Sequence, residues 1–164
     1  MKKVLLCLLV LLASCKKDES SPLPKATQEG KNTFGCLLDG QVFLPTSSHN
    51  IFQPIRPLRG LFLRREIGIQ AYGEQGQMYL ALRDAFRPGT YTLGETATGN
   101  YASLNRSMGM FYTSSTRGGS LTLTRIDTVA RVVAGTFEFS ALDYYRGGTG
   151  GTITVTSGRF DVTF

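Results

Sequence analysis

The sequence predicts an all-β fold: an antiparallel β-sandwich, with a small closed β-barrel as the alternative. From Thr33 onward, apolar and polar residues alternate with a period of two, as in strands that bury one face. Gly, Pro and Asp residues that favour turns interrupt this alternation at short intervals, and almost nothing has the apolar spacing of a helix. Many short strands separated by turns favour a sandwich or barrel, here as one domain over residues 33–164.

The domain opens with a predicted hairpin. Its strands, Thr33 to Leu38 and Gln41 to Leu44, flank Asp39-Gly40, a dipeptide that tolerates the positive φ angles of a tight turn. Turn signals such as Arg87-Pro88-Gly89 and the glycine-rich segment 146–151 separate the later strands. The alternation predicts these further strands: Gly60 to Arg64, Ile67 to Tyr72, Gln77 to Arg83, Thr90 to Leu93, Met108 to Thr113, Ser120 to Ile126, Arg131 to Leu142, Thr152 to Thr156 and Arg159 to Phe164.

A short pattern occurs twice in the C-terminal half. Gly119 to Thr124 matches Gly151 to Thr156, and Gly135 to Phe139 matches Gly158 to Val162. In each copy a strand with alternating threonines precedes a strand with alternating apolar residues, so the threonines and acids are expected to face water. The opposite positions are expected to share one core: Leu121, Leu123, Ile153, Val155, Phe137, Phe139, Phe160 and Val162.

The first residues have the pattern of an export signal. Two lysines precede the apolar run Val4 to Ala13, which is far shorter than the roughly 20 residues of a membrane-spanning helix. The run ends in Leu12-Ala13-Ser14-Cys15, which resembles the lipobox of bacterial lipoproteins. We therefore expect residues 1–14 to be removed as a signal peptide and Cys15 to carry acyl chains that anchor the protein to a membrane.

Residues 15–32 form a predicted flexible tether between the lipidated cysteine and the domain, because they are polar, contain two prolines and show no apolar periodicity. Lys16 to Glu19 resembles the short charged signal that sends some lipoproteins of the Bacteroidetes lineage to the outer face of the outer membrane. An ordinary solvated linker is the alternative. The predicted location is the outer membrane, with the cell surface and the periplasmic face both open.

Charge and cysteine content exclude several function classes. The chain has 18 basic and 12 acidic side chains, and removal of two signal-peptide lysines leaves a mildly basic protein. A nucleic-acid partner is not expected, since the sequence has no clustered basic face with interleaved aromatics. Cys7 leaves with the signal and Cys15 carries lipid, so Cys36 has no partner within the chain. Its apolar neighbours predict a buried, inert thiol.

Few residues are suited to catalysis or metal binding. The single histidine, His49, lies in a predicted loop, and no Cys/His cluster or acidic loop has zinc or calcium spacing. Glu138 and Asp161 are the acids most suited to a general acid/base pair, although alternation predicts that both are ordinary solvated carboxylates. We expect no enzymatic activity and no cofactor. The alternative is a cell-envelope hydrolase built from Glu138, Asp161 or His49.

Every basic residue after Lys31 is arginine. Arg56, Arg59, Arg64 and Arg65 form a speculative binding site for an anionic glycan or lipid headgroup, because guanidinium groups suit carboxylate, sulfate and phosphate; scattered surface charge is the alternative. Tyrosines could instead stack on sugar rings, but their spacing in the sequence singles out no platform. The seven tyrosines are Tyr72, Tyr79, Tyr91, Tyr101, Tyr112, Tyr144 and Tyr145.

Three parts of the chain carry a family resemblance: Pro24 to Gly40, Leu121 to Asp127 together with Gly135 to Phe139, and Gly158 to Val162. They resemble a family of uncharacterised Bacteroidetes lipoproteins classed as a domain of unknown function. The resemblance covers nearly the whole mature chain, implies a lipid-anchored all-β domain and brings no catalytic residues. The predicted function is that of a non-catalytic binding or accessory module at the cell envelope, whose ligand is an anionic glycan, a lipid headgroup or an envelope protein.

Overall fold

The structure is a computed structural model, and it describes residues 21–47, 56–145 and 151–164. These residues form β-strands and one short 3-10 helix, η1 (Thr96–Thr98), and the strand pairs are antiparallel. The strands are β1 (Thr33–Leu38), β2 (Gln41–Phe43), β3 (Leu58–Leu63), β4 (Glu66–Gly73), β5 (Gly76–Arg83), β6 (Gly89–Leu93), β7 (Tyr101–Arg106), β8 (Gly109–Tyr112), β9 (Gly119–Asp127), β10 (Val132–Asp143) and β11 (Thr152–Thr163).

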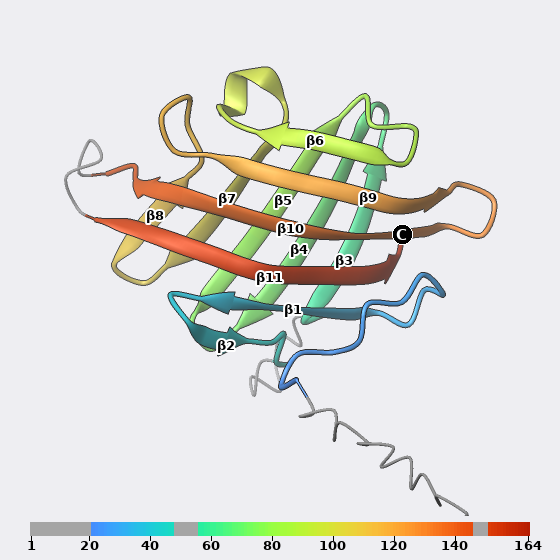
Figure 1. Cartoon of the computed structure of the whole chain (residues 1–164), viewed down its shortest axis with the longest axis horizontal. Helices are drawn as coiled ribbons and strands as arrows, with labels where there is room; N and C mark the ends of the chain where they lie inside the picture. The colour runs from blue at the N-terminus through green and yellow to red at the C-terminus, as the bar shows by residue number, and fades with distance from the viewer. Residues whose placement is uncertain (1–20, 48–55, 146–150) are drawn as a thin grey trace, which may run out of the picture.

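One strongly curled sheet contains all of these strands and forms a half-barrel. Its main path runs β2-β1-β11-β10-β8-β7-β5-β4-β3, and β9 and β6 branch from β10. The branch exists because Val132 to Phe139 of β10 pair with β9, whereas Leu142 and Asp143 pair with β8. Strands β3, β4, β5 and β7 consequently cross behind β9, β10 and β11 (Figure 1). The antiparallel all-β prediction is confirmed, but one continuous sheet takes the place of the two separate sheets of the predicted sandwich.

The predicted opening hairpin is present. Leu38 pairs with Gln41 across a two-residue turn in which Asp39 has φ 51° and Gly40 has φ 79°. Positive φ at both central residues is the backbone that matches the right-handed twist of the flanking strands, and Asp-Gly supplies it at little steric cost.

Two strand predictions need correction. We predicted no strand at β7, although Ala102 and Leu104 are buried there in alternation with partly exposed or exposed residues. We also predicted a break near Ser157, where the structure has one continuous strand, β11. Ser157 has φ 54°, and the β10–β11 register shifts between Phe137 and Phe139. The predicted turn is therefore an irregularity of β-bulge type within a strand, which does not end the pairing.

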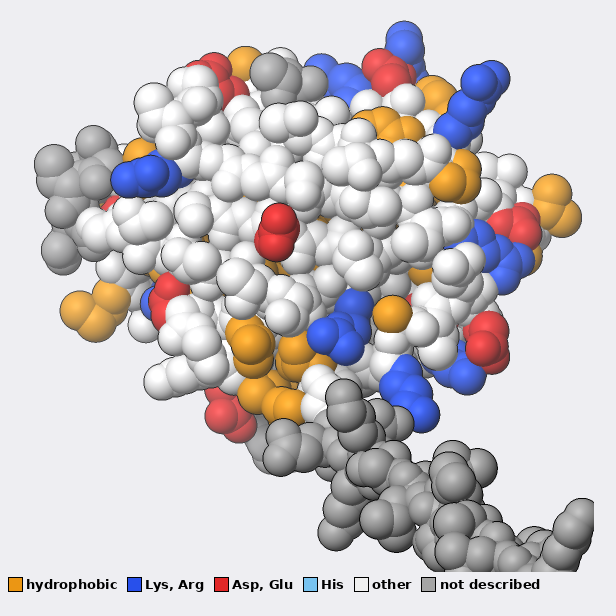
Figure 2. Space-filling model, in the orientation of Figure 1, with side chains coloured by type: hydrophobic (Ala, Val, Ile, Leu, Met, Phe, Trp, Pro, Cys, Tyr) orange, Lys and Arg blue, Asp and Glu red, His pale blue; other side chains and the backbone are white. Residues whose placement is uncertain are grey.

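The interior of the curled sheet is the core. All eight apolar residues expected from the repeated pattern are buried, and Cys36 is buried among them, as predicted. Burial raises the pKa of the Cys36 thiol to about 12. The threonines of the same strands point outward. Figure 2 accordingly shows a mostly uncharged face over β6, β9, β10 and β11.

The N-terminal segment ahead of β1 packs on the sheet. Residues 21–32 belong to the predicted flexible tether, yet Leu23 is buried and Asp161 of β11 accepts hydrogen bonds from residues 27–31. The folded unit thus includes residues before Thr33. Cys15 and His49 lie outside the described residues, and no helix among the described residues is long and apolar enough to cross a membrane.

Candidate functional site

The two acids of the hydrolase hypothesis are not brought together. Asp161 is fully buried, which corrects the prediction that it is solvated, and it lies opposite Ala134 in the β10–β11 ladder. Glu138 is exposed and lies four residues further along β10, about 13 Å away along the strand. The structure thus does not place Glu138 and Asp161 together as an acid/base pair.

The buried carboxylate of Asp161 instead holds the N-terminal segment. It accepts hydrogen bonds from the Thr27 hydroxyl at 2.6 Å and from the backbone N–H groups of Glu29, Gly30 and Lys31 at 2.9, 2.7 and 3.2 Å. Burial acts to raise its pKa, but these hydrogen bonds outweigh burial and lower the pKa of Asp161 below its usual value. The Asp161 carboxylate therefore has a structural role: it fastens residues 27–31 to β11, and we call this set of hydrogen bonds the clasp.

The four arginines lie along the edge strand β3 and do not form one cluster. All four are exposed. Arg59 is the second residue of β3, whereas Arg64 and Arg65 form the two-residue turn to β4, so about 16 Å of strand separates Arg59 from Arg64. Arg65 is paired with Asp84. Arg56 precedes β3, on the side away from the turn.

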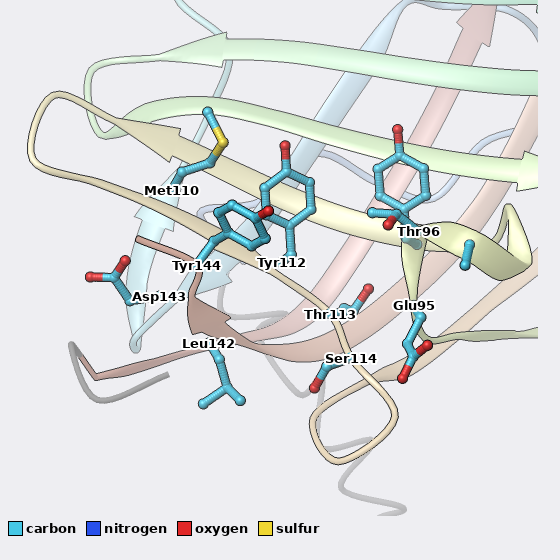
Figure 3. Close-up of a pocket in the computed structure, with 11 residues that line it drawn as sticks. Glu95, Thr96, Met110, Tyr112, Thr113, Ser114, Leu142, Asp143 and Tyr144 are labelled. Atoms are coloured by element: carbon cyan, nitrogen blue, oxygen red, sulfur yellow. The ribbon is translucent and has the colours of Figure 1, made fainter. Parts of the chain in front are cut away.

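A different part of the surface is hollowed into a groove. The groove has a volume of about 690 Å³ and lies between the segment around η1 and the strands β7, β8 and β10. Tyr112 and Tyr144 lie beside Met110 on one side of the hollow, and Glu95 and Thr96 lie on the other (Figure 3). Residues from four separate parts of the chain therefore meet here.

Five tyrosine rings form a continuous row that runs into this groove. Ring centroids are 6.0 Å apart from Tyr79 to Tyr101, 6.2 Å from Tyr101 to Tyr112, 5.6 Å from Tyr112 to Tyr144 and 6.0 Å from Tyr144 to Tyr145. The first three rings belong to the neighbouring strands β5, β7 and β8, and the last two follow β10. We call these five residues the tyrosine row.

Hydrogen bonds fix both ends of the row. The Tyr79 hydroxyl donates to Glu66 Oε1 at 2.9 Å, and its ring covers Gly68, where an added Cβ would lie 2.6 Å from the hydroxyl oxygen. At the other end, the Tyr144 N–H donates to the Met110 carbonyl at 2.7 Å, and the Tyr145 N–H donates to Asp143 Oδ1 at 3.1 Å. These hydrogen bonds hold the Tyr79 hydroxyl and the backbone that carries Tyr144 and Tyr145.

The wall opposite the tyrosines is held by Thr113. This residue is 2% exposed, and its hydroxyl accepts from the Ala102 N–H at 3.0 Å and donates to the Gly94 carbonyl at 2.5 Å. The bond to Gly94 ties the segment that precedes η1 to β7 and β8. One buried hydroxyl thus links the segment around Gly94 to β7 and β8.

The described residues that line the groove include hydroxyl groups and acids, and none of them is Lys or Arg. Glu95 and Asp143 are its charged lining residues. Burial, followed by the hydrogen bond from Tyr79 to Glu66, raises the pKa of the Tyr79 phenol, and burial, followed by the charge of Glu66, raises the pKa of Tyr101. Both phenols are therefore neutral at physiological pH: the Tyr79 hydroxyl donates to Glu66 and can still accept, and the Tyr101 hydroxyl can donate or accept. No group of His, Cys, Asp and Glu among the described residues is arranged to hold a metal ion.

The sequence analysis listed these tyrosines but did not predict that they form the tyrosine row. Their positions are scattered along 67 residues, from Tyr79 to Tyr145, and only the strand register places them in one row. Alternation supplied a partial signal: Ala102 and Leu104 face the core, so Tyr101 must face outward. Without β7 in the predicted strand list, that signal could not be used.

Comparison with known proteins identifies the family to which this chain belongs. A family model described as "Domain of unknown function (DUF6252)" matches residues 63–162. The predicted resemblance to a family of unknown function with an all-β fold is confirmed to that extent; the match does not extend to lipoprotein character or source. No curated protein and no solved structure gives a significant match.

Proposed function

This chain belongs to the DUF6252 family, a domain of unknown function, so the family supplies no activity. We propose a function from the residues on the surface of this protein. It is a lipid-anchored, non-catalytic binding module of the cell envelope, and the groove with the tyrosine row is its ligand site. The single observation that carries this proposal is the row of five neighbouring tyrosine rings, three of which line a groove where the Thr113 hydroxyl links the segment around Gly94 to β7 and β8.

The groove has the properties of a binding site. Ligand sites are typically clefts of about 300–1,000 Å³ with aromatic walls and a few polar groups in fixed positions, and a volume of about 690 Å³ falls within this range. Tyrosine gives a large contact area for little loss of conformational entropy, and it is enriched where proteins bind partners. Catalysis receives no comparable support, since Glu138 and Asp161 are separated in the sheet.

The predicted lipid anchor would determine where the groove lies relative to the membrane. Ser21, the first described residue, follows Cys15 by six residues, which span at most about 20 Å of extended chain. Figure 1 shows residues 21–32 beside β1, on the opposite side of the molecule from η1, which forms one wall of the groove. A lipid on Cys15 would hold the domain close to the outer membrane and leave the groove directed away from the lipid.

The anchor is tested by Cys15→Ala in the full chain, with metabolic labelling by a radioactive fatty acid. We expect loss of the label and accumulation of the uncleaved precursor. Labelling that survives the substitution would refute the anchor. Protease added to intact cells then shows which face of the outer membrane carries the protein. Complete protection in intact cells, with digestion after lysis, would exclude exposure at the cell surface.

The binding role is tested by photocrosslinking in intact cells. A photoreactive phenylalanine at Tyr144, whose side chain is 68% exposed in the groove, should form covalent adducts. The matched control carries the same group at Val129, which is 95% exposed in the turn between β9 and β10. Adducts at position 144 alone support a ligand site in the groove. An equal yield at both positions, or none at 144, rejects it.

A further inference from the structure

We propose that one face of the domain rests on the anionic surface of the membrane that carries the anchor, and that this contact sets the orientation of the domain. We call this face the anchor-side patch, and its residues are Pro22, Pro24, Val42, Leu44 and Pro45. The inference rests on the lipid anchor of the proposed function and goes beyond it, because a lipid on Cys15 does not decide which face of the domain meets the membrane.

Apolar side chains from two separate parts of the chain meet in this patch. Pro24 and Leu44 both lie over Gly35 of β1, where an added Cβ would be 2.7 Å from Pro24 Cδ and 3.0 Å from Leu44 Cδ2. Val42 is 39% exposed and Leu44 is 40% exposed, while Phe43 between them is buried. Figure 2 shows hydrophobic side chains gathered over β1 and β2, with Lys and Arg side chains beside them. Apolar side chains gathered on an exposed surface indicate an interaction site.

Four of the six prolines in the chain line a hollow at this patch. The hollow has a volume of about 370 Å³, and its lining includes Pro22, Pro24, Pro45 and Pro57. A proline has no backbone N–H to donate, so this surface is poorly suited to pairing with a strand of another protein. Strand β2, at this edge of the sheet, has three residues. These features favour a partner that contacts side chains, as a lipid surface does.

The charged residues next to the hollow are basic. Four residues lie within two positions of a residue that lines it, and no Asp or Glu of the sequence does: Lys25, Lys31, Arg56 and Arg59. All four are exposed. Lys31 is paired with Glu29 at 3.0 Å, and the other three form no salt bridge with another described residue. Each Lys or Arg near an anionic lipid surface favours the docked state by about fivefold.

The described chain begins at the patch. Ser21 is adjacent to Pro22, and the six residues from Cys15 to Ser21 span at most about 20 Å. The clasp and the buried Leu23 hold the N-terminal segment on the sheet. A lipid on Cys15 therefore keeps the patch within about 20 Å of the bilayer. At the effective concentration that such a short tether gives, contacts too weak to bind a membrane alone are sufficient to hold one face against it.

The test is spin labelling of the full lipidated protein in vesicles of phosphatidylglycerol and phosphatidylcholine. Val42→Cys carries the label in the patch. Ala97→Cys is the matched control, because η1 lies on the opposite side of the molecule from residues 21–32 (Figure 1). Cys36 is buried and does not compete for the label. Relaxation by oxygen, which is enriched in the bilayer, and by a water-soluble nickel complex shows which position faces the lipid. We expect position 42 to be shielded from nickel and position 97 to be accessible.

Neutralising the three unpaired basic residues should release the patch. This variant combines Lys25→Gln, Arg56→Gln and Arg59→Gln. The ratio of docked to undocked domain should fall by about a hundredfold, so that nickel reaches positions 42 and 97 equally. Salt at about 1 M, where the Debye length is about 3 Å, should act in the same direction. The matched control makes the same change of charge at exposed arginines away from the hollow, and it should leave position 42 shielded: Arg64→Gln, Arg87→Gln and Arg117→Gln.

Flotation of the same samples separates failure of the inference from failure of the anchor. If the protein floats with the vesicles while positions 42 and 97 are equally accessible to nickel, the anchor stands and the docking inference is wrong. If the protein does not float, the anchor fails and the inference fails with it. Shielding that persists in pure phosphatidylcholine at high salt would overturn the assignment to an anionic surface. Shielding that rises with the density of protein on the vesicles would overturn it in favour of contact between two copies of the chain.

Discussion

Gly158 of β11 lies directly opposite Phe137 of β10, and a Cβ added to Gly158 would lie 2.5 Å from the Phe137 ring. The relationship is reciprocal. Gly135 of β10 lies opposite Phe160 of β11, whose ring would be 2.9 Å from an added Cβ. Each Gly-x-Phe copy of the repeated sequence thus supplies the glycine that accommodates the other copy's phenylalanine, as aromatic residues do when they cover glycines in sheets.

Gly158→Ala should destabilise the protein by about 1–3 kcal/mol, because the Phe137 ring must leave its position in a packed core. Urea unfolding followed by circular dichroism measures the change. Gly94→Ala is the matched control, since nothing lies within 4 Å of an added Cβ there. A stability for Gly158→Ala equal to that of the control would show that the ring moves freely.

The repeated sequence shows how far prediction from sequence reaches in this protein. Alternation located most strands and the core of β9, β10 and β11, because burial on one face is a local property of a strand. It could not show that Leu142 and Asp143 leave β9 and pair with β8, since that choice depends on residues far along the chain.

The candidate site was less predictable than the fold for the same reason. Tyr101 and Tyr112 are in contact only because β7 pairs with β8, and Tyr144 joins them through the end of β10. For Asp161, the sequence predicted the face of the sheet correctly but not the burial. Alternation correctly placed its side chain on the outer face of the sheet, but the N-terminal segment covers that face and buries the carboxylate.

Asp161→Ala should destabilise the protein by about 2–4 kcal/mol. The substitution removes the acceptor of the Thr27 hydroxyl and of three backbone N–H groups, and enclosed donors that lose a charged acceptor are costly. Chemical denaturation of the two proteins at neutral pH measures the difference. Glu138→Gln, a change at an exposed acid of the neighbouring strand, should stay within about ±0.5 kcal/mol. Equal stabilities for these two variants would mean that the clasp contributes nothing.

The same carboxylate should make stability depend on acid pH. Hydrogen bonds lower the pKa of Asp161 in the folded protein below the value of about 3.9 that an unfolded chain has. Its contribution is therefore complete above that unfolded value and is lost as the pH falls through the lower folded value. The stability difference between wild type and Asp161→Asn should be constant from about pH 8 to pH 5 and narrow below about pH 4. A difference that widens on acidification would contradict the lowered pKa.

Thr113→Val should weaken both the fold and the groove. Valine keeps the shape of threonine but cannot accept from the Ala102 N–H or donate to the Gly94 carbonyl, so buried polar groups lose their partners at a cost of about 1–3 kcal/mol. Because the lost bond to Gly94 ties down the wall that carries Glu95, the affinity for any ligand of the groove should fall as well. Urea unfolding measures the first effect, and the yield of the photocrosslink at position 144 measures the second. Thr90→Val is the matched control: the Thr90 hydroxyl pairs with that of Thr122 at an exposed position of β6, outside the groove. Loss of stability in Thr113→Val with an unchanged crosslink yield would show that the hydroxyl supports the fold without affecting the groove.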